Sequence, residues 1–334
     1  MVSGKADAKR DANLVVPEDV TAVYDINYAG NADAYNLLDV YYPKDTDHLL
    51  PVIVSIHGGG YVYGTKEIYK YYGMYLAQQG FTFVNFNYHL APEAKFPTQL
   101  TETNMVMEWM CDHADEYHLD LNNVILVGDS AGSQMTSQYA AIATNADYAK
   151  LFPFTVPEEI KIRALGLNCG MYTLTILGKD GKVNKMNKEL YGDYLGKDFD
   201  FSNEKIDVLG HITADYPPTY VMTSYYDFLK ENAQPMYEFL KGKGIPCAWK
   251  CYGSEDKKYM AHVCHVNMNL EEAKEINQDE CAFFRKYLVC KQPCMRIKEK
   301  ETRRWCILQM QVCRNLKKSI SQRCARLHRN VRYS

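Results

Sequence analysis

Short apolar runs alternate with amphipathic stretches along the first 290 residues of this chain. Continuous apolar runs are typical of strands that are covered on both faces of a parallel sheet. The runs predict eight strands, at residues 22–28, 37–42, 52–57, 81–87, 124–128, 164–169, 219–224 and 247–252. Because the first two runs are half polar, we expect them to form an antiparallel edge.

Helical periodicity fills the intervals between these strands. It predicts helices over residues 69–79, 101–117, 133–144, 232–243 and 270–288. Gly80, Asn145 and Gly244 directly follow three of these segments, where a residue in the left-handed conformation commonly ends a helix. Strands alternating with helices over this length predict an α/β fold, with a mostly parallel eight-stranded sheet flanked by helices.

The segment 172–217 interrupts this alternation. It mixes glycine with lysine, asparagine, tyrosine and phenylalanine. We interpret the segment as a small cap insertion over the strand ends. A long surface excursion without a function is the alternative.

The charge of the chain is distributed unevenly. Residues 291–334 contain 13 Lys and Arg against 2 Asp and Glu, a net +11, which leaves −14 for residues 1–290. We therefore divide the chain into an acidic domain, residues 1–290, and a basic C-terminal extension, residues 291–334, which we expect to be poorly structured. A nucleic-acid or anionic-membrane arm is the alternative for the extension, because clustered Lys and Arg bind polyanions.

The absence of targeting signals and the spacing of the cysteines predict a cytoplasmic protein. No apolar run has the length of a signal peptide or of a membrane span. The 11 cysteines include no pair at the CxxC spacing of metal sites. We therefore expect reduced thiols and no metal centre.

The most informative motif is Gly128-Asp129-Ser130-Ala131-Gly132, because the apolar run 124–127 leads directly into it and a helical segment follows. This strand–turn–helix context is that of a nucleophile elbow, whose sharp turn exposes the serine Oγ. The N–H of Ala131 would then point at a developing oxyanion. Asp129 would point away from the serine, so we expect it to hold neighbouring loops.

A second motif, His57-Gly58-Gly59-Gly60, follows the predicted strand 52–57. Consecutive glycines allow backbone N–H groups to approach a substrate without an intervening Cβ. We predict that Gly59 and Gly60 complete the oxyanion hole with Ala131, and that His57 and Gly58 support the motif.

A nucleophilic serine needs a base, and in this architecture an acid and then a histidine follow it along the chain. Asp227 follows the strand 219–224 and is the predicted acid, with Glu231 as its rival. His262 is the predicted base because it lies nearer the preceding strand end. His265 is the alternative.

These segments, in this order, resemble the hormone-sensitive-lipase-like family of α/β-hydrolases, in its GDSAG-type branch, over roughly residues 20–290. The segment Asn87–Glu93 with Phe96-Pro97 also matches. The resemblance implies an α/β-hydrolase fold and hydrolysis of carboxylic esters, usually with short acyl chains, through a serine acyl-enzyme and without a metal or organic cofactor.

Three features depart from the family pattern. His89 stands where the family usually has Arg, and Val263-Cys264 stand where Gly-Phe often follows the catalytic histidine. Only about 20 residues precede the first predicted strand, whereas many relatives carry a helical N-terminal cap. The acyl-chain preference therefore cannot be transferred from the family.

We expect a serine carboxylesterase of the acetyl esterase type that acts on small-molecule esters through Ser130, Asp227 and His262. A catalytically inactive ligand-binding protein on the same fold is one alternative, and an amidase or peptidase using the same triad is another. We expect no nucleic-acid partner, and the sequence is compatible with a homodimer.

Overall fold

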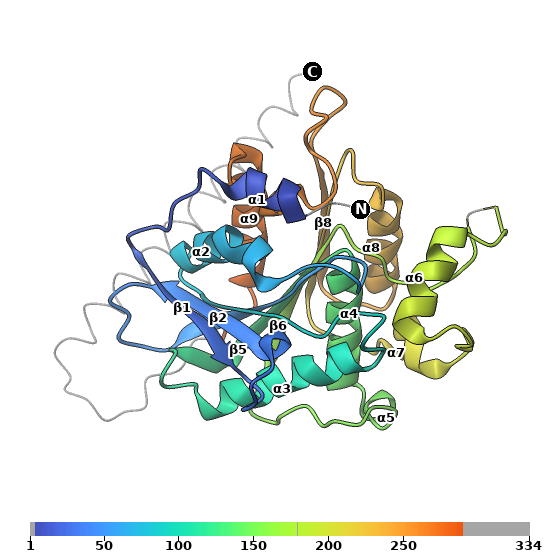
Figure 1. Ribbon diagram of the computed structural model, residues 1–334, viewed down its shortest axis with the longest axis horizontal. Helices are drawn as coiled ribbons and strands as arrows, with labels where there is room; N and C mark the ends of the chain where they lie inside the picture. The colour runs from blue at the N-terminus through green and yellow to red at the C-terminus, as the bar shows by residue number, and fades with distance from the viewer. Residues whose placement is uncertain (1–3, 179, 290–334) are drawn as a thin grey trace, which may run out of the picture. The chain divides into compact units, whose positions relative to one another are not determined.

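The computed structural model describes residues 4–178 and 180–289 (Figure 1). These residues belong to one contact unit, which ends at Val289. The predicted basic extension, residues 291–334, lies outside the described residues.

One sheet of eight strands forms the centre of this unit, in the order β1-β2-β4-β3-β5-β6-β7-β8. β2 runs antiparallel to β1 and to β4, and the other neighbouring strands are parallel. The predicted α/β fold and its antiparallel edge are therefore confirmed. The strands are β1 (Val20–Asn27), β2 (Leu37–Pro43), β3 (Leu50–Ile56), β4 (Thr82–Phe86), β5 (Leu119–Asp129), β6 (Ile162–Asn168), β7 (Thr219–Ser224) and β8 (Cys247–Tyr252).

Helices cover both faces of the sheet (Figure 1). Because side chains alternate along a strand, neighbouring residues of β3 enter different cores. Val54 packs in the core that includes residues of α3, α4 and α8, and Ile53 packs in the core that includes residues of α2 and α9. The helices are α1 (Gly4–Asp11), α2 (Lys70–Gln78), α3 (Thr98–Asp112), α4 (Ala131–Thr144), α5 (Ala146–Ala149), α6 (Lys185–Leu195), α7 (Val208–His211), α8 (Ala233–Gly242) and α9 (Glu271–Phe284).

The left-handed conformation expected at the three helix ends is present at two of them. Gly80 and Gly244 have φ of +89° and +75°. The prediction for Asn145 is wrong, because its backbone is extended with φ of −132°. Its side chain instead accepts the N–H groups of Asp147 and Tyr148 and so caps the start of α5.

The segment 172–217 connects β6 to β7 and contains α6, α7 and a 3-10 helix over Glu204–Ile206. Tyr194 of α6 stacks on Tyr61 with ring centroids 3.7 Å apart, and Tyr194 O accepts the N–H of Phe96. The segment therefore contacts the loop that follows β3. Its role as a cap stays a prediction.

None of the helices in the described part of the chain is both long enough and apolar enough to cross a bilayer.

Candidate active site

Ser130 lies at the sharp turn between β5 and α4 and has φ of +54°, which is uncommon for a residue with a side chain. The flanking glycines are required by close packing. A Cβ at Gly132 would lie 2.0 Å from Ile56 O, and a Cβ at Gly128 would lie 2.4 Å from Gly132 O. The N–H of Ser130 donates to Asn168 O at 2.9 Å, which fixes the turn to β6. Ser130 is half-buried between buried neighbours.

Asp129 is buried and faces the glycine loop, residues 58–60, which follows β3. A Cβ at Gly58 would lie 2.4 Å from Asp129 Oδ2, so only glycine fits beside this carboxylate. Burial raises the pKa of Asp129 to about 6, although hydrogen bonding to Tyr69 and a favourable interaction with His262 oppose this rise. Asp129 therefore packs the turn at Ser130 against the glycine loop.

The side chain of His57 supports the glycine loop. The imidazole is fully buried, stacks on Tyr88 at 4.0 Å and donates from Nδ1 to Gly58 O at 2.8 Å. Burial lowers the pKa of His57 to about 4, so the ring is neutral at pH 7. Gly59 has φ of +115° and runs so close to Tyr63 O that a Cβ would lie 1.9 Å from it.

Within the described residues, no hydrogen bond uses the N–H groups of Gly59, Gly60 or Ala131. Unpaired backbone N–H groups in a glycine loop and at the start of a helix are suited to bind a negative oxygen. These three donors are the ones that the sequence motifs predict.

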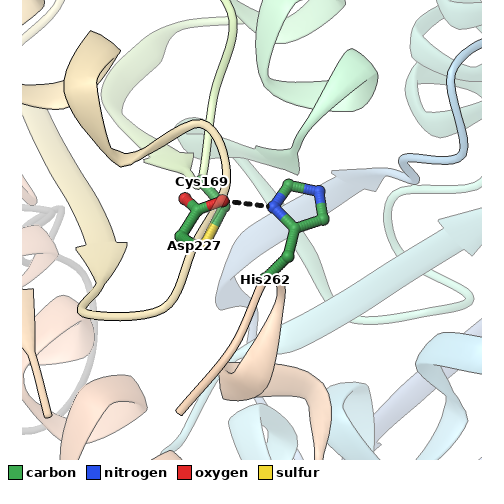
Figure 2. Close-up of side chains that lie close together, drawn as sticks. All are labelled: Cys169, Asp227 and His262. Carbon is green, nitrogen blue, oxygen red and sulfur yellow. Dashed lines mark hydrogen bonds and ion pairs between the residues drawn. The ribbon is translucent and has the colours of Figure 1, made fainter. Parts of the chain in front are cut away.

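Asp227 and His262 form a hydrogen-bonded pair in the segments that follow β7 and β8 (Figure 2). His262 Nδ1 donates to Asp227 Oδ1 at 2.6 Å. Asp227 also accepts the hydroxyl of Thr223 at 2.7 Å and the N–H of Leu229 at 2.9 Å. Burial acts to raise the pKa of Asp227, but these hydrogen bonds and the attraction to His262 outweigh it, and the pKa is lowered. The charged carboxylate keeps the proton of His262 on Nδ1 and leaves Nε2 free to accept another.

The alternative base, His265, and the alternative acid, Glu231, lie outside this hydrogen-bonded pair. His265 is buried, its ring lies edge-on to Tyr72 at 5.3 Å, and its Nδ1 has no hydrogen-bond partner in the described residues. Burial lowers the pKa of His265 to about 3. Glu231 is exposed in a 3-10 helix, Lys230–Asn232. The structure therefore pairs Asp227 with His262, and neither rival takes part.

No hydrogen bond among the described residues joins Ser130 to His262. Catalytic hydrogen bonds are often long before a substrate is bound and tighten in the complex. Ser130, Asp227 and His262 follow three strands of the parallel part of the sheet, whose carboxyl ends lie at one edge. The three side chains thus share the edge where ligands bind in open α/β sheets.

Two contacts of the Asp227–His262 pair were not predicted. Thr223 supports the carboxylate from within β7, and the ring of Phe228 lies 4.1 Å from the imidazole of His262 although 71% of Phe228 is exposed. The only sequence signal for either residue is its proximity to Asp227.

His89, which replaces the usual arginine, joins two carboxylates. Its Nδ1 lies 2.5 Å from Glu102 Oε1 and its Nε2 lies 3.1 Å from Asp33 Oδ2. Partial burial acts to lower the pKa of His89, but the two carboxylates outweigh it and raise the pKa. While it is protonated, the histidine therefore forms a cationic link between Asp33 and Glu102 of α3.

A histidine with a raised folded pKa stabilises the fold fully below its unfolded pKa, about 6.5, and the stabilisation is lost as the pH rises through the folded value. We expect His89→Gln to lower Tm by about 1–3 °C at pH 6 and by less at pH 9. Thermal unfolding of both proteins across this range measures the difference. His48→Gln, at an exposed histidine, is the control, and a Tm difference for His89→Gln that is independent of pH would contradict the expectation.

Comparisons with known proteins agree with this architecture. An acetyl esterase of Salmonella typhi is 23% identical over 265 residues, which covers 73% of this chain and 74% of that protein. The crystal structure of esterase B from Lactobacillus rhamnosis has a TM-score of 0.75 at 24% identity, covering 85% of this chain and 91% of that one. A bacterial heroin esterase has a TM-score of 0.65 at 18% identity, covering 86% and 92%.

These structural matches show the α/β-hydrolase fold, and the resemblance to hormone-sensitive-lipase-like hydrolases is confirmed. The BD-FAE family model matches residues 38–236, which is more than half of the chain. This chain therefore belongs to the BD-FAE family, among the α/β-hydrolases.

Proposed function

We propose that this chain is a serine carboxylesterase that hydrolyses short-chain acyl esters with Ser130, His262 and Asp227. The observation that carries the proposal is the 2.6 Å bond between His262 and the buried Asp227, at the sheet edge where Ser130 occupies a strained turn. The relatives named acetyl esterase and the structures named esterase support a carboxylic ester hydrolase.

In this mechanism the imidazole of His262 accepts one proton and then donates it in each half-reaction. Nε2 takes the proton of the Ser130 hydroxyl while Oγ attacks the ester carbonyl. The imidazolium is stabilised by the negative charge of Asp227 and then protonates the leaving alcohol. In the second half-reaction Nε2 takes a proton from water while the water oxygen attacks the acyl carbon, and it then returns that proton to Ser130 Oγ as the ester bond breaks and the acid leaves. No metal or organic cofactor takes part in these steps.

The negative charge of the tetrahedral intermediate requires donors that are already in place. The N–H groups of Gly59, Gly60 and Ala131 are the proposed donors, because they have no other partner among the described residues. A prearranged donor of this kind typically contributes about 10²- to 10³-fold to the rate.

The preference for short acyl chains is proposed from the segment 172–217, acting as a cap. Leu190 of α6 approaches the glycine loop so closely that its Cδ1 would lie 3.4 Å from a Cβ at Gly60. Tyr194 of the same helix stacks on Tyr61, which follows the glycine loop, and both rings are fully buried. An apolar wall beside the proposed oxyanion hole would leave little room for a long acyl chain.

An acyl-length series tests this wall. We expect the wild type to hydrolyse p-nitrophenyl acetate and butyrate with a higher kcat/KM than the decanoate. Leu190→Ala should raise kcat/KM for the longer esters about 3- to 30-fold relative to acetate, because removing methylene groups opens the site. Leu177→Ala, at an exposed leucine of the same segment, is the control. An unchanged chain-length profile in Leu190→Ala would contradict the role of the wall.

Active-site labelling tests the proposed function itself. A fluorophosphonate should label the protein at Ser130, identified by peptide mapping, and prior boiling should abolish the labelling. A ligand-binding protein on the same fold would remain unlabelled and would not hydrolyse p-nitrophenyl acetate. An amidase would hydrolyse the matched anilide at a rate comparable with the ester. Either of these two results would contradict the proposed carboxylesterase function.

A further inference from the structure

Cys169, the residue that follows β6, lies directly beside the Asp227–His262 pair (Figure 2). One ligand atom from each residue, the thiol sulfur, a carboxylate oxygen and a ring nitrogen, lies within 4.8 Å of the other two. We propose that these three residues form an inhibitory site for Zn²⁺ and similar borderline-soft divalent cations. The site itself is independent of the proposed function, and only the inhibition rests on it.

The thiol is held in this position by backbone on two sides. The N–H of Cys169 donates to Met222 O at 2.7 Å, and the N–H of Val263, next to His262, donates to Cys169 Sγ at 3.4 Å. Cys169 has φ of +48° and Val263 has φ of +61°, and for a β-branched residue such a value is a genuine outlier. The strained residues Cys169 and Val263 therefore lie next to Asp227 and His262. The sulfur of Cys169 faces both of these side chains.

The three ligand types match the chemistry of zinc. Zn²⁺ binds thiolate, imidazole and carboxylate in a tetrahedron, and sites with three protein ligands leave a fourth position for water. With Zn–S of about 2.3 Å and Zn–N or Zn–O of about 2.1 Å, ligand atoms in a tetrahedron are roughly 3.3–3.6 Å apart. The 2.6 Å contact between His262 and Asp227 must therefore widen by up to about 1 Å, and the sulfur, which lies within 4.8 Å of both ligand atoms, must approach them by at most about 1.5 Å.

Charge and access also favour this site. A thiolate and a carboxylate together neutralise a divalent cation, and a neutral set is the arrangement that a buried position tolerates. The carboxylate of Asp227 accepts from His262, Thr223 and Leu229. Asp227 and Cys169 are buried, whereas the side chain of His262 is 20% exposed, so the ion would enter along the imidazole.

Binding changes the protonation of the catalytic base. The ion takes the lone pair of His262 Nδ1, so the proton on Nδ1 moves to Nε2 through solvent. The thiol of Cys169 loses its proton to solvent at the same time. Nε2 then already carries a proton and cannot take one from Ser130. The cation would inhibit turnover without filling the acyl pocket, as an inhibitor and not as a cofactor.

The experiment compares the wild type with Cys169→Ser and with Cys264→Ser. Serine in place of Cys169 preserves the acceptor for the Val263 N–H but is not among the usual zinc ligands. Cys264 is the matched control, because it is a buried thiol in the loop that carries His262 and lies outside the three-residue set. Each variant retains the cysteines of residues 290–334, so any ion bound there contributes equally to all three proteins.

Two measurements are made on the full chain. The first is p-nitrophenyl acetate hydrolysis against ZnCl₂, each variant relative to its own uninhibited rate, with reversal by EDTA. We expect the half-inhibitory concentration to rise at least about tenfold in Cys169→Ser and to stay near the wild-type value in Cys264→Ser. The second is the thiolate-to-metal charge-transfer absorption with CoCl₂, which needs no hydrolysis. We expect a band of equal intensity in the wild type and in Cys264→Ser, and a weaker band in Cys169→Ser.

Equal inhibition of the wild type and Cys169→Ser by zinc would contradict the proposed site. An active wild type that zinc does not inhibit would also contradict it. A cobalt band of the same intensity in Cys169→Ser as in the wild type would contradict it too. If the chain hydrolyses no ester, the proposed function fails, and the cobalt spectra alone decide whether the site exists.

Discussion

Ser130→Ala should lower kcat for p-nitrophenyl acetate by at least about a thousandfold, because without Oγ no acyl-enzyme can form. Alanine is smaller than serine and carries no new polar group, so the strained turn and its bond to Asn168 should survive. KM should change much less than kcat, since the oxyanion donors and the acyl wall remain. Steady-state kinetics measures both, and circular dichroism checks the fold.

Ser137→Ala is the matched control for this experiment. Ser137 lies in the same helix, α4, and its hydroxyl accepts a hydrogen bond from Tyr216 at 2.9 Å. Its loss should cost about 1 kcal/mol of stability and leave kcat unchanged. If Ser130→Ala retained wild-type hydrolysis, the nucleophile would have to lie elsewhere and the assignment would fail.

The strands were predictable because apolar runs bounded by turn residues mark them. The predicted ranges 219–224 and 247–252 coincide with β7 and β8. β5 begins at Leu119, five residues before the predicted start, because polar residues hide its first half. Asp120 and Asn123 are buried there and bond to each other, a pairing that a hydropathy pattern cannot show.

No helix is predicted from the sequence in the segment 172–217, because glycine and polar residues are frequent there. α6 nevertheless has apolar side chains at helical spacing, namely Met186, Leu190, Tyr191, Tyr194 and Leu195. What orders it is long-range packing, with Tyr194 stacked on Tyr61 of a loop more than a hundred residues earlier. Such a contact appears only in the folded chain.

The candidate site was partly predictable because a rule of chain order connects serine, acid and histidine in this fold. The choice between His262 and His265 needed coordinates, since the residues are three apart and the backbone reverses at Val263 with φ of +61°. Cys169 had no signal in the sequence. Its place beside Asp227 follows from the register of β6 with β7, where Asn168 pairs with Met222.

Asp227→Ala should lower kcat about 10⁴-fold, because His262 loses both the group that orients its ring and the charge that stabilises the imidazolium. Asp227→Asn should lose at least about tenfold less than Asp227→Ala. In this site Oδ1 accepts from both His262 and the N–H of Leu229, so an amide oxygen can stay there and keep the Nδ1–H tautomer. The amide nitrogen would then face Thr223, whose hydroxyl can accept as well as donate.

Glu231→Gln is the control for both variants, because Glu231 is exposed and has the same chemistry at the rival position. Its kcat should equal that of the wild type, and Tm should change by little. Comparable losses in Glu231→Gln and Asp227→Asn would mean that general electrostatics around the loop, and not the bond to His262, supports the base. A loss in Asp227→Asn as large as in Asp227→Ala would show that the amide reverses and forces the proton onto Nε2. The hydrogen bond from Leu229 would then be too weak to fix the tautomer.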